Sequence, residues 1–198
     1  MTVQYSMLFD LNRCTGCNAC VVACKQENDL PPGTDAKPGE TGFSFINVEC
    51  FGPEGVYPDL SMYYQPTLCM HCAEPPCIDA CPVEAIIKRD DGIVLIDKEA
   101  CTGCEACLEA CPYDAVSMDD EQGIARKCTL CAPLIDESHD PACAAACNAG
   151  AIIFGDVGDG ASEISRLIRE STDDVFVLKP EMKTGPSMRY LQFFRKKD

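Results

Sequence analysis

Sixteen of the 17 cysteines in this 198-residue sequence occur in four groups of four, and only Cys50 stands apart. The groups are Cys14, Cys17, Cys20 and Cys24; Cys69, Cys72, Cys77 and Cys81; Cys101, Cys104, Cys107 and Cys111; and Cys128, Cys131, Cys143 and Cys147. Cysteine thiolates form disulfides or bind soft metals. The odd total and the regular spacing argue against a disulfide framework, so the four groups predict metal sites.

The third group indicates which metal chemistry the spacing favours. Its C-x2-C-x2-C-x3-C-P pattern, from Cys101 to Pro112, matches the ligand pattern of bacterial ferredoxins that hold iron–sulfur clusters. Small residues such as Gly16 and Gly103 lie in the gaps and let each loop curl around a compact cluster. Zinc is the alternative, above all for the looser fourth group, but zinc ribbons do not repeat three cysteines followed by x3-Cys-Pro.

In two-cluster ferredoxins the fourth cysteine of each group binds the other cluster. This rule predicts four [4Fe–4S] clusters with the following ligands: Cys14, Cys17, Cys20 and Cys147; Cys128, Cys131, Cys143 and Cys24; Cys69, Cys72, Cys77 and Cys111; and Cys101, Cys104, Cys107 and Cys81. The two central groups then share one module, and the two outer groups share another that encloses it.

Short helices and strands must position these loops. After the last cysteine of three groups the chain repeats a turn, an alanine and a β-branched residue, at Ala85-Ile86, Ala115-Val116 and Ala151-Ile152, which is typical of a helix ending and a strand starting. The other expected elements are strands at Thr2–Asp10, Phe43–Phe51, Ser61–Gln65, Ile93–Ile96 and Val175–Leu178, a turn-rich loop at Gln26–Thr41 and an amphipathic helix at Ser162–Ser171.

The sequence therefore predicts an α+β fold of two ferredoxin-like, two-cluster modules with long loops and an extended C-terminal tail. The outer module comprises residues 1–66 plus 126–178, the inner module residues 67–125 and the tail residues 179–198. The tail carries six basic residues against two acidic ones. We expect it to dock a partner subunit, rather than bind RNA or stay solvated, and expect truncation at Leu178 to leave four clusters but abolish the complex.

Composition excludes several classes of protein. The net charge is −16, which argues against a nucleic-acid-binding protein because phosphate contacts need a positive face. No apolar run approaches the roughly 20 residues that span a bilayer, so direct membrane insertion is not expected. Residues Met1–Leu11 have no basic n-region or long apolar stretch, so we expect no export signal.

A few residues outside the four groups could influence a bound cluster. Lys25, Lys127 and Arg126 lie next to or near cysteines, where they could raise the local potential or be solvated charges. His71 lies between two cysteines and is expected to make a hydrogen bond rather than bind metal. His139 is expected at the surface, and Cys50, in an apolar strand, is expected to be a buried small hydrophobe.

Three stretches of sequence resemble one known family, namely Leu68-Cys69-Met70-His71-Cys72 with Pro75-Pro76-Cys77, Arg126-Lys127-Cys128-Thr129-Leu130-Cys131, and Thr184-Gly185-Pro186-Ser187-Met188-Arg189-Tyr190-Leu191. The chain resembles the iron–sulfur electron-transfer subunits of the dimethyl sulfoxide reductase family of molybdopterin oxidoreductases over essentially its whole length. One departure is Asn148, where the family usually has proline after the last cysteine. Some members lack a cysteine in the third group, but this chain has all four.

The resemblance implies an electron-transfer subunit without catalytic residues in an anaerobic oxidoreductase complex. Its partners would be a large molybdopterin-containing catalytic subunit and a membrane anchor or soluble donor. The molybdopterin would belong to the partner alone. A polyferredoxin-type subunit of a hydrogenase is the alternative, and a zinc-stabilised interaction module is a more distant one. The compartment would be the cytoplasm, a membrane surface reached through partners, or the periplasm after export with a signal-bearing partner.

Overall fold

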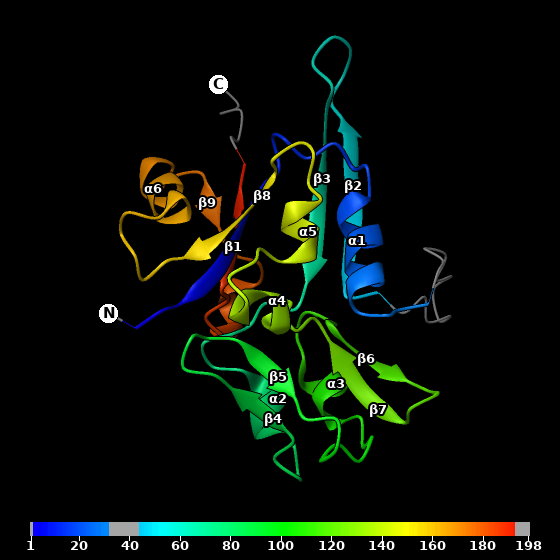
Figure 1. The fold of residues 1–198 in the computed structure, drawn as a ribbon. Helices are drawn as coiled ribbons and strands as arrows, with labels where there is room; N and C mark the ends of the chain where they lie inside the picture. The colour runs from blue at the N-terminus through cyan, green and yellow to red at the C-terminus, as the bar shows by residue number, and fades with distance from the viewer. Residues whose placement is uncertain (1, 32–43, 193–198) are drawn as a thin grey trace.

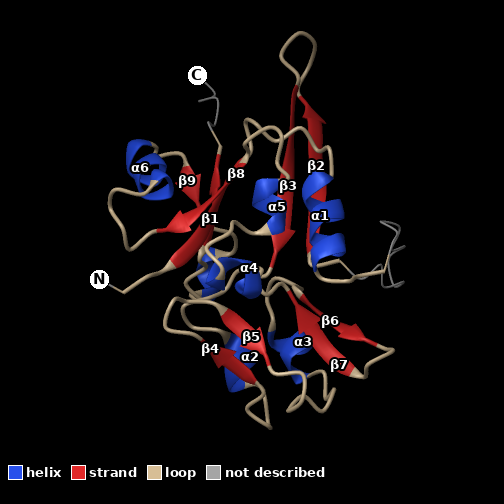
Figure 2. Ribbon diagram, viewed as in Figure 1, coloured by secondary structure: helices blue, strands red, loops and turns tan. Residues whose placement is uncertain are grey.

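The computed structural model describes residues 2–31 and 44–192 as a mixed α+β protein in which short helices pack among small sheets (Figures 1 and 2). The strands are β1 (Tyr5–Asp10), β2 (Ile46–Glu54), β3 (Ser61–Leu68), β4 (Ile86–Lys88), β5 (Val94–Ile96), β6 (Val116–Asp119), β7 (Ile124–Lys127), β8 (Ile152–Asp156), β9 (Val175–Phe176) and β10 (Met188–Leu191). The helices are α1 (Ala19–Glu27), α2 (Pro76–Asp79), α3 (Ala106–Ala110), α4 (Ala132–Asp136), α5 (Ala142–Ala145), α6 (Glu163–Glu170) and the 3-10 turn η1 (Pro180–Met182). The predicted α+β class is confirmed.

The largest sheet has the strand order β8-β1-β10-β9, with β1 antiparallel to β8 and parallel to β10. Side chains of β1 alternate between two buried layers. Leu8 packs against Ile164 of α6, whereas Met7 and Phe9 point into the core that contains cysteines. Because both faces are covered, β1 is buried from Ser6 onward, which explains its nearly continuous apolar sequence.

Three antiparallel hairpins complete the strand content of the described residues, namely β2–β3, β4–β5 and β6–β7. The two short hairpins gather with α2 and α3 at one end of the molecule, and the main sheet lies with α1, α5 and β2–β3 toward the other end (Figure 1). Helix α4 lies between the two ends in the same view. The ends have largely separate buried clusters, one of which draws all its members from residues 77–125.

Most expected elements occur, with shifted boundaries. Strands β1, β5 and β9 are shorter than predicted, and the strands expected near residues 43–51 and 61–65 form the longer hairpin β2–β3. The amphipathic helix is confirmed as α6, where the Ser162 Oγ accepts a hydrogen bond of 3.3 Å from the Ser165 N–H and caps the helix. Most of the predicted Gln26–Thr41 loop lies outside the described residues.

The expectation of a separate C-terminal tail is wrong for residues 188–191. These residues form β10, which lies between β1 and β9 in the main sheet, and Met188, Tyr190 and Leu191 are buried. Basic residues in a sequence suggest exposure, but Met188 and Tyr190 alternate onto one buried face of this strand, and Leu191 packs on the opposite face. The last residues of the predicted tail, 193–198, lie outside the described residues.

In the part of the chain that the structure describes, none of the helices has both the length and the apolar character required to cross a bilayer.

Candidate functional site

Three cavities each have one of the predicted ligand sets in their walls, so cysteines from two distant segments meet in each. One cavity is lined by Cys14, Cys17, Cys20 and Cys147. A second is lined by Cys69, Cys72, Cys77 and Cys111. A third is lined by Cys101, Cys104, Cys107 and Cys81. In each case the distant partner is the last cysteine of another group.

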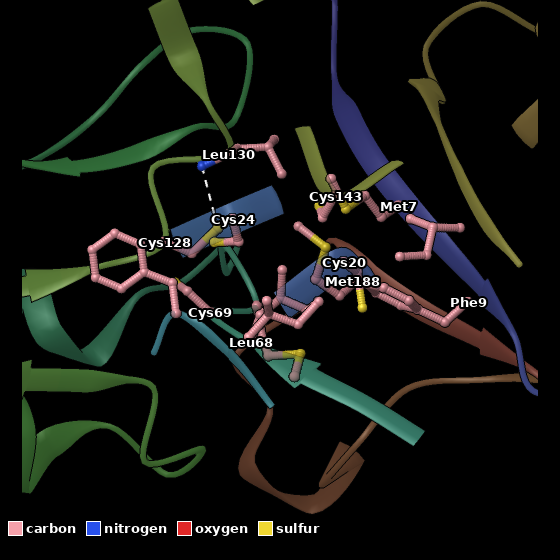
Figure 3. Close-up of a cluster of buried hydrophobic side chains, with 14 of the residues drawn as sticks. Met7, Phe9, Cys20, Cys24, Leu68, Cys69, Cys128, Leu130, Cys143 and Met188 are labelled. Carbon is pink, nitrogen blue, oxygen red and sulfur yellow. Dashed lines mark hydrogen bonds between the residues drawn. The ribbon is translucent and has the colours of Figure 1, made fainter. Parts of the chain in front are cut away.

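The remaining four cysteines are all buried, and three of them, Cys24, Cys128 and Cys143, belong to the largest buried cluster. Burial raises the pKa of Cys24, and the nearby Cys128 and Cys131 thiols raise it further. Burial likewise raises the pKa of Cys143, and the Cys131 and Cys24 thiols raise it further. Figure 3 shows Cys24, Cys128 and Cys143 among the apolar side chains of this core. Thiols from α1, α5 and the 128–131 loop therefore converge here.

The loops that carry the first cysteines depend on left-handed backbone conformations. Gly16 and Gly103 occupy equivalent positions and have φ values of 67° and 68°. A Cβ on Gly103 would lie 2.3 Å from the carbonyl oxygen of Gly123, so the approach of the neighbouring hairpin also requires glycine there. These two glycines let consecutive C-x2-C segments turn around one cavity, as the spacing predicts.

The repeated alanine after each last cysteine has a structural role. The Ala85 N–H donates to the Cys81 Sγ over 3.2 Å, and the Ala151 N–H donates to the Cys147 Sγ over 3.3 Å. The intervening Glu84 has a positive φ of 53° and Gly150 one of 58°, so the same tight turn recurs. The N–H donors would stabilise a negatively charged thiolate, because hydrogen bonds to the charged form favour it.

Burial opposes thiolate formation at most of these positions when nothing is bound. Desolvation raises the pKa of Cys20 to about 11, that of Cys72 to about 11 and that of Cys77 to about 12, and neighbouring thiols contribute in each case. Gathering four such groups is unfavourable unless a cation compensates their charges. Since a bound metal keeps its thiol ligands deprotonated, the cysteine sets are suited to a metal centre.

Two lysines near cysteines are buried, which excludes the interpretation of them as solvated charges. The Lys127 Nζ donates to the Val94 carbonyl oxygen and, over 3.2 Å, to the Cys128 carbonyl oxygen. Its charge lowers the pKa of Cys77 and of Cys128, against the larger effect of burial. The Lys25 Nζ donates to the Pro31 carbonyl oxygen over 3.0 Å. Because water is excluded around the Lys127 ammonium, its charge acts more strongly on the Cys77 and Cys128 thiols than an exposed charge would.

The two histidines lie where the sequence predicts, but Cys50 does not. His71 is buried, and its Nδ1 accepts a hydrogen bond of 3.0 Å from the Val94 N–H. His139 is exposed near Glu137. Cys50 is exposed on β2, so the expectation of a buried small hydrophobe is wrong. In β2 Ile46 is buried, but most residues after it are exposed. The apolar residues of this strand do not indicate that exposure.

A segment near the C-terminus braces the loop of the second cysteine group, which sequence reasoning missed. The Ala73 N–H donates to the Gly185 carbonyl oxygen over 2.8 Å, and the Glu74 N–H donates to the Thr184 carbonyl oxygen over 2.9 Å. The Ser187 Oγ donates to the His71 carbonyl oxygen over 2.7 Å. The Thr-Gly-Pro-Ser sequence at residues 184–187 is turn-like, but nothing local indicates which loop it contacts.

The donor sets fit iron–sulfur clusters. All 17 cysteines are free thiols, and four all-thiol sets match the ligand requirement of [4Fe–4S] centres. In the described ranges no three His, Cys, Asp or Glu side chains are placed to hold a single metal ion. The thiols instead lie around the walls of cavities, an arrangement that suits a multi-atom cluster.

Two sequence-family models described as 4Fe-4S dicluster domains match the chain, one over residues 60–157 and one over residues 13–85. A subunit of tetrathionate reductase from Salmonella typhimurium is 40% identical over 188 residues, which cover 95% of this chain and 72% of the relative. A subunit of sulfite dehydrogenase from Allochromatium vinosum is 42% identical, with coverages of 95% and 82%. The arsenate respiratory reductase iron-sulfur subunit of a Shewanella species is 30% identical, with 97% of each chain covered.

The fold and the cysteine sets define an iron–sulfur protein with two dicluster domains and four [4Fe–4S] clusters. The chain belongs to the iron–sulfur electron-transfer subunits of the dimethyl sulfoxide reductase family of molybdopterin oxidoreductases. The resemblance noted in the sequence is thereby confirmed, and the zinc-module alternative is excluded.

Proposed function

We propose that this chain conducts electrons between a large molybdopterin-containing catalytic subunit and a second redox partner, and that it has no catalytic residues. A bound [4Fe–4S] cluster supplies reversible one-electron oxidation and reduction without bond formation to a substrate. Three cavities support this role because each is lined by a complete set of four cysteines that can hold one cluster. The protein's task is therefore to space and insulate the clusters.

The observation that carries the proposal is the order in which the cysteine sets adjoin one another. The Cys20 thiol lies near Cys24 and Cys143, which links the first set to the fully buried one. Cys128 of the buried set lies near Cys69 of the next. Cys77 and Cys107 then share one hydrophobic cluster, which connects the third set to the last. The four sets thus lie in sequence, and the clusters that they hold would form a single electron-transfer chain.

The exposure of the cysteines supports electron entry and exit at the two ends of that path. Cys17 in the first set and Cys104 in the last set are exposed. The set formed by Cys24, Cys128, Cys131 and Cys143 is buried throughout. Since electron exchange with a partner requires close approach, we assign the Cys17 and Cys104 regions to the two partner contacts, one to the catalytic subunit and the other to a membrane anchor or soluble donor.

The proposed ligands are the four sets given by the exchange of last cysteines. The shared cavities support this assignment, as does the turn in which an alanine N–H faces the last sulfur. We also propose that the inner module, residues 67–125, is inserted within the outer one. The separate buried cluster of residues 77–125 supports the insertion, whereas the two matching family models overlap at residues 60–85 and divide the chain sequentially.

The first test is chemical. Anaerobically purified protein is expected to be brown, with iron and acid-labile sulfide each near 16 per chain for four clusters of four irons. A large subunit that co-purifies with it is expected to contain a pterin with molybdenum or tungsten. A co-purifying subunit that instead contains nickel would support the hydrogenase alternative and contradict the proposal.

The ligand exchange is tested with pairs of variants. Cys14→Ser and Cys147→Ser are expected to alter the same cluster signal in electron paramagnetic resonance, because both thiols line one cavity. Cys24→Ser is expected to alter a different signal, although Cys24 follows Cys14 in the same group. Cys50→Ser is the matched control and is expected to leave all four signals unchanged because Cys50 lies outside the sets. If Cys24→Ser and Cys14→Ser perturbed the same signal, last cysteines would not be exchanged.

A further inference from the structure

The buried His71 presents an unsatisfied nitrogen beside one of the cysteine cavities. Its Nε2 is buried and has no hydrogen-bond partner among the described residues. His71 lines the same cavity as Cys69, Cys72, Cys77 and Cys111, and it lies in the loop between the first two of these. Buried polar groups without partners are rare in folded proteins, so this atom requires a partner that the described residues do not supply.

The hydrogen bond on the other side of the ring determines what Nε2 carries. A backbone N–H is a donor only, so the Nδ1 that receives the Val94 N–H must hold a lone pair. The imidazole is then neutral, and its single ring proton lies on Nε2. The Ser187 Oγ fixes the His71 backbone through its carbonyl oxygen, so the residue is held from two sides. His71 is thus a preorganised N–H donor that finds no acceptor among residues 2–31 and 44–192.

We propose that His71 Nε2–H donates a hydrogen bond to a sulfur of the cluster held by Cys69, Cys72, Cys77 and Cys111, and that this bond raises the reduction potential of that cluster. The inference rests on the proposed ligand assignment. A hydrogen bond to a cluster sulfur stabilises the reduced form more than the oxidised form, because the reduced form carries more negative charge. His71 is therefore a positioning residue that tunes one cluster of the four.

The site around His71 strengthens the effect of such a bond. The Lys127 ammonium lies at the wall of the same cavity, where water is excluded, and its charge favours the reduced form in the same sense. Lys127 donates to the Val94 carbonyl oxygen, while the Val94 N–H donates to His71. One residue of β5 therefore orients both the histidine and the lysine toward this cavity.

Two substitutions of His71 distinguish loss of its N–H donor from loss of its packing. In His71→Asn the side-chain oxygen can still accept from the Val94 N–H, but no donor reaches the Nε2 position. Asparagine also tolerates the positive φ of 42° at this residue. We expect one of the four midpoint potentials to fall by an amount equal to at least a tenfold loss in the reduced-to-oxidised ratio, which is about 59 mV for a one-electron couple. His71→Gln returns an amide N–H to the Nε2 position and is expected to restore part of the shift.

A second measurement does not depend on substituting His71. The chain has only two histidines, so His139→Asn, at an exposed position, leaves His71 as the sole source of histidine nitrogen. In this variant labelled with ¹⁵N-histidine, pulsed paramagnetic resonance is expected to show a nitrogen coupling on one reduced cluster only. That cluster should be the one whose potential falls in His71→Asn.

The outcomes are distinct. A labelled His139→Asn protein with four clusters and no nitrogen coupling would overturn the role of His71 and leave the proposed function intact. Four unchanged potentials in a fully loaded His71→Asn protein would do the same. If His71→Asn fails to assemble its clusters, the labelling result decides alone. Fewer than four clusters in wild-type protein would contradict the proposed ligand sets, and the inference with them.

Discussion

At the scale of single residues, the cysteine loops depend on positions that accept a left-handed backbone. Gly16 and Gly103 are the clearest cases, because each precedes a ligand-bearing cysteine and each is approached closely by another part of the chain. The spacing of thiols is therefore only half of the local requirement. The other half is a backbone that turns sharply between them, which few residues other than glycine allow without strain.

Gly103 offers a direct test of this requirement, with Gly123 as a matched control. Both have positive φ values, but a Cβ at Gly123 meets nothing within 4 Å, whereas one at Gly103 meets the Gly123 carbonyl oxygen. Gly123→Ala is expected to cost about 1–2 kcal/mol from backbone strain alone. Gly103→Ala is expected to cost more, because a hairpin must also move. The measurement is the rate at which the cluster absorbance bleaches in guanidinium under argon, and equal rates for the two variants would contradict the argument.

At the scale of elements, the C-terminal strand is a structural member of the fold. β10 fills the gap between β1 and β9, and the preceding residues 184–187 hold the loop that carries Cys69 and Cys72. An early strand and a late strand therefore pair in parallel at the centre of the main sheet. The basic residues of this region do not indicate an independent docking tail.

Truncation tests this point and reverses the expectation drawn from the sequence. Removing residues 179–198 deletes β10 and the brace, so we expect loss of β-sheet signal in circular dichroism and loss of iron from at least the Cys69–Cys77 loop. Removing only residues 193–198 is the control, since β10 and its register with β1 remain whole. A protein that ends at Leu178 and still binds 16 irons would show that β10 is dispensable.

At the scale of the whole molecule, the proposed cluster ligands are also part of the buried core. Cysteines are members of the two largest buried clusters. Among the described residues, the cluster within residues 77–125 has few buried members, namely Cys77, Ile86, Val94, Cys107, Val116 and Ala125. So few apolar side chains contribute little burial free energy. The end of the molecule that contains α2 and α3 must therefore depend most on its clusters for stability.

Cluster removal is expected to unfold the two ends unequally. After anaerobic oxidation and chelation, hydrogen exchange measured by mass spectrometry should show nearly complete loss of protection over residues 77–125. The sheet formed by β1, β8 and β10 should retain partial protection, because Leu8, Ile164 and Leu191 pack there without cysteine. Equal loss of protection in both regions would mean that the molecule is one cooperative unit.

The local sequence was sufficient to predict the features that depend on residues close together in the chain, namely the candidate ligands, the repeated turn and the amphipathic helix. The spacing of the cysteines selected the sixteen candidate ligands, and the repeated Cys-x3-Ala pattern indicated the turn whose N–H faces sulfur at Cys81 and Cys147. The helix at Glu163–Glu170 was also predictable, because its cap at Ser162 and its apolar face are local features.

Only the tertiary structure decided which side chains are buried and which distant segments meet. Burial of Lys127, exposure of Cys50 and the insertion of β10 beside β1 all depend on contacts between segments far apart in the chain. Such contacts form between segments that are distant in the sequence, so a pattern of neighbouring residues does not predict which segments will meet. The role proposed for His71 belongs to this second class, because it was recognised from the Val94 hydrogen bond on one side of the ring and the unsatisfied nitrogen on the other.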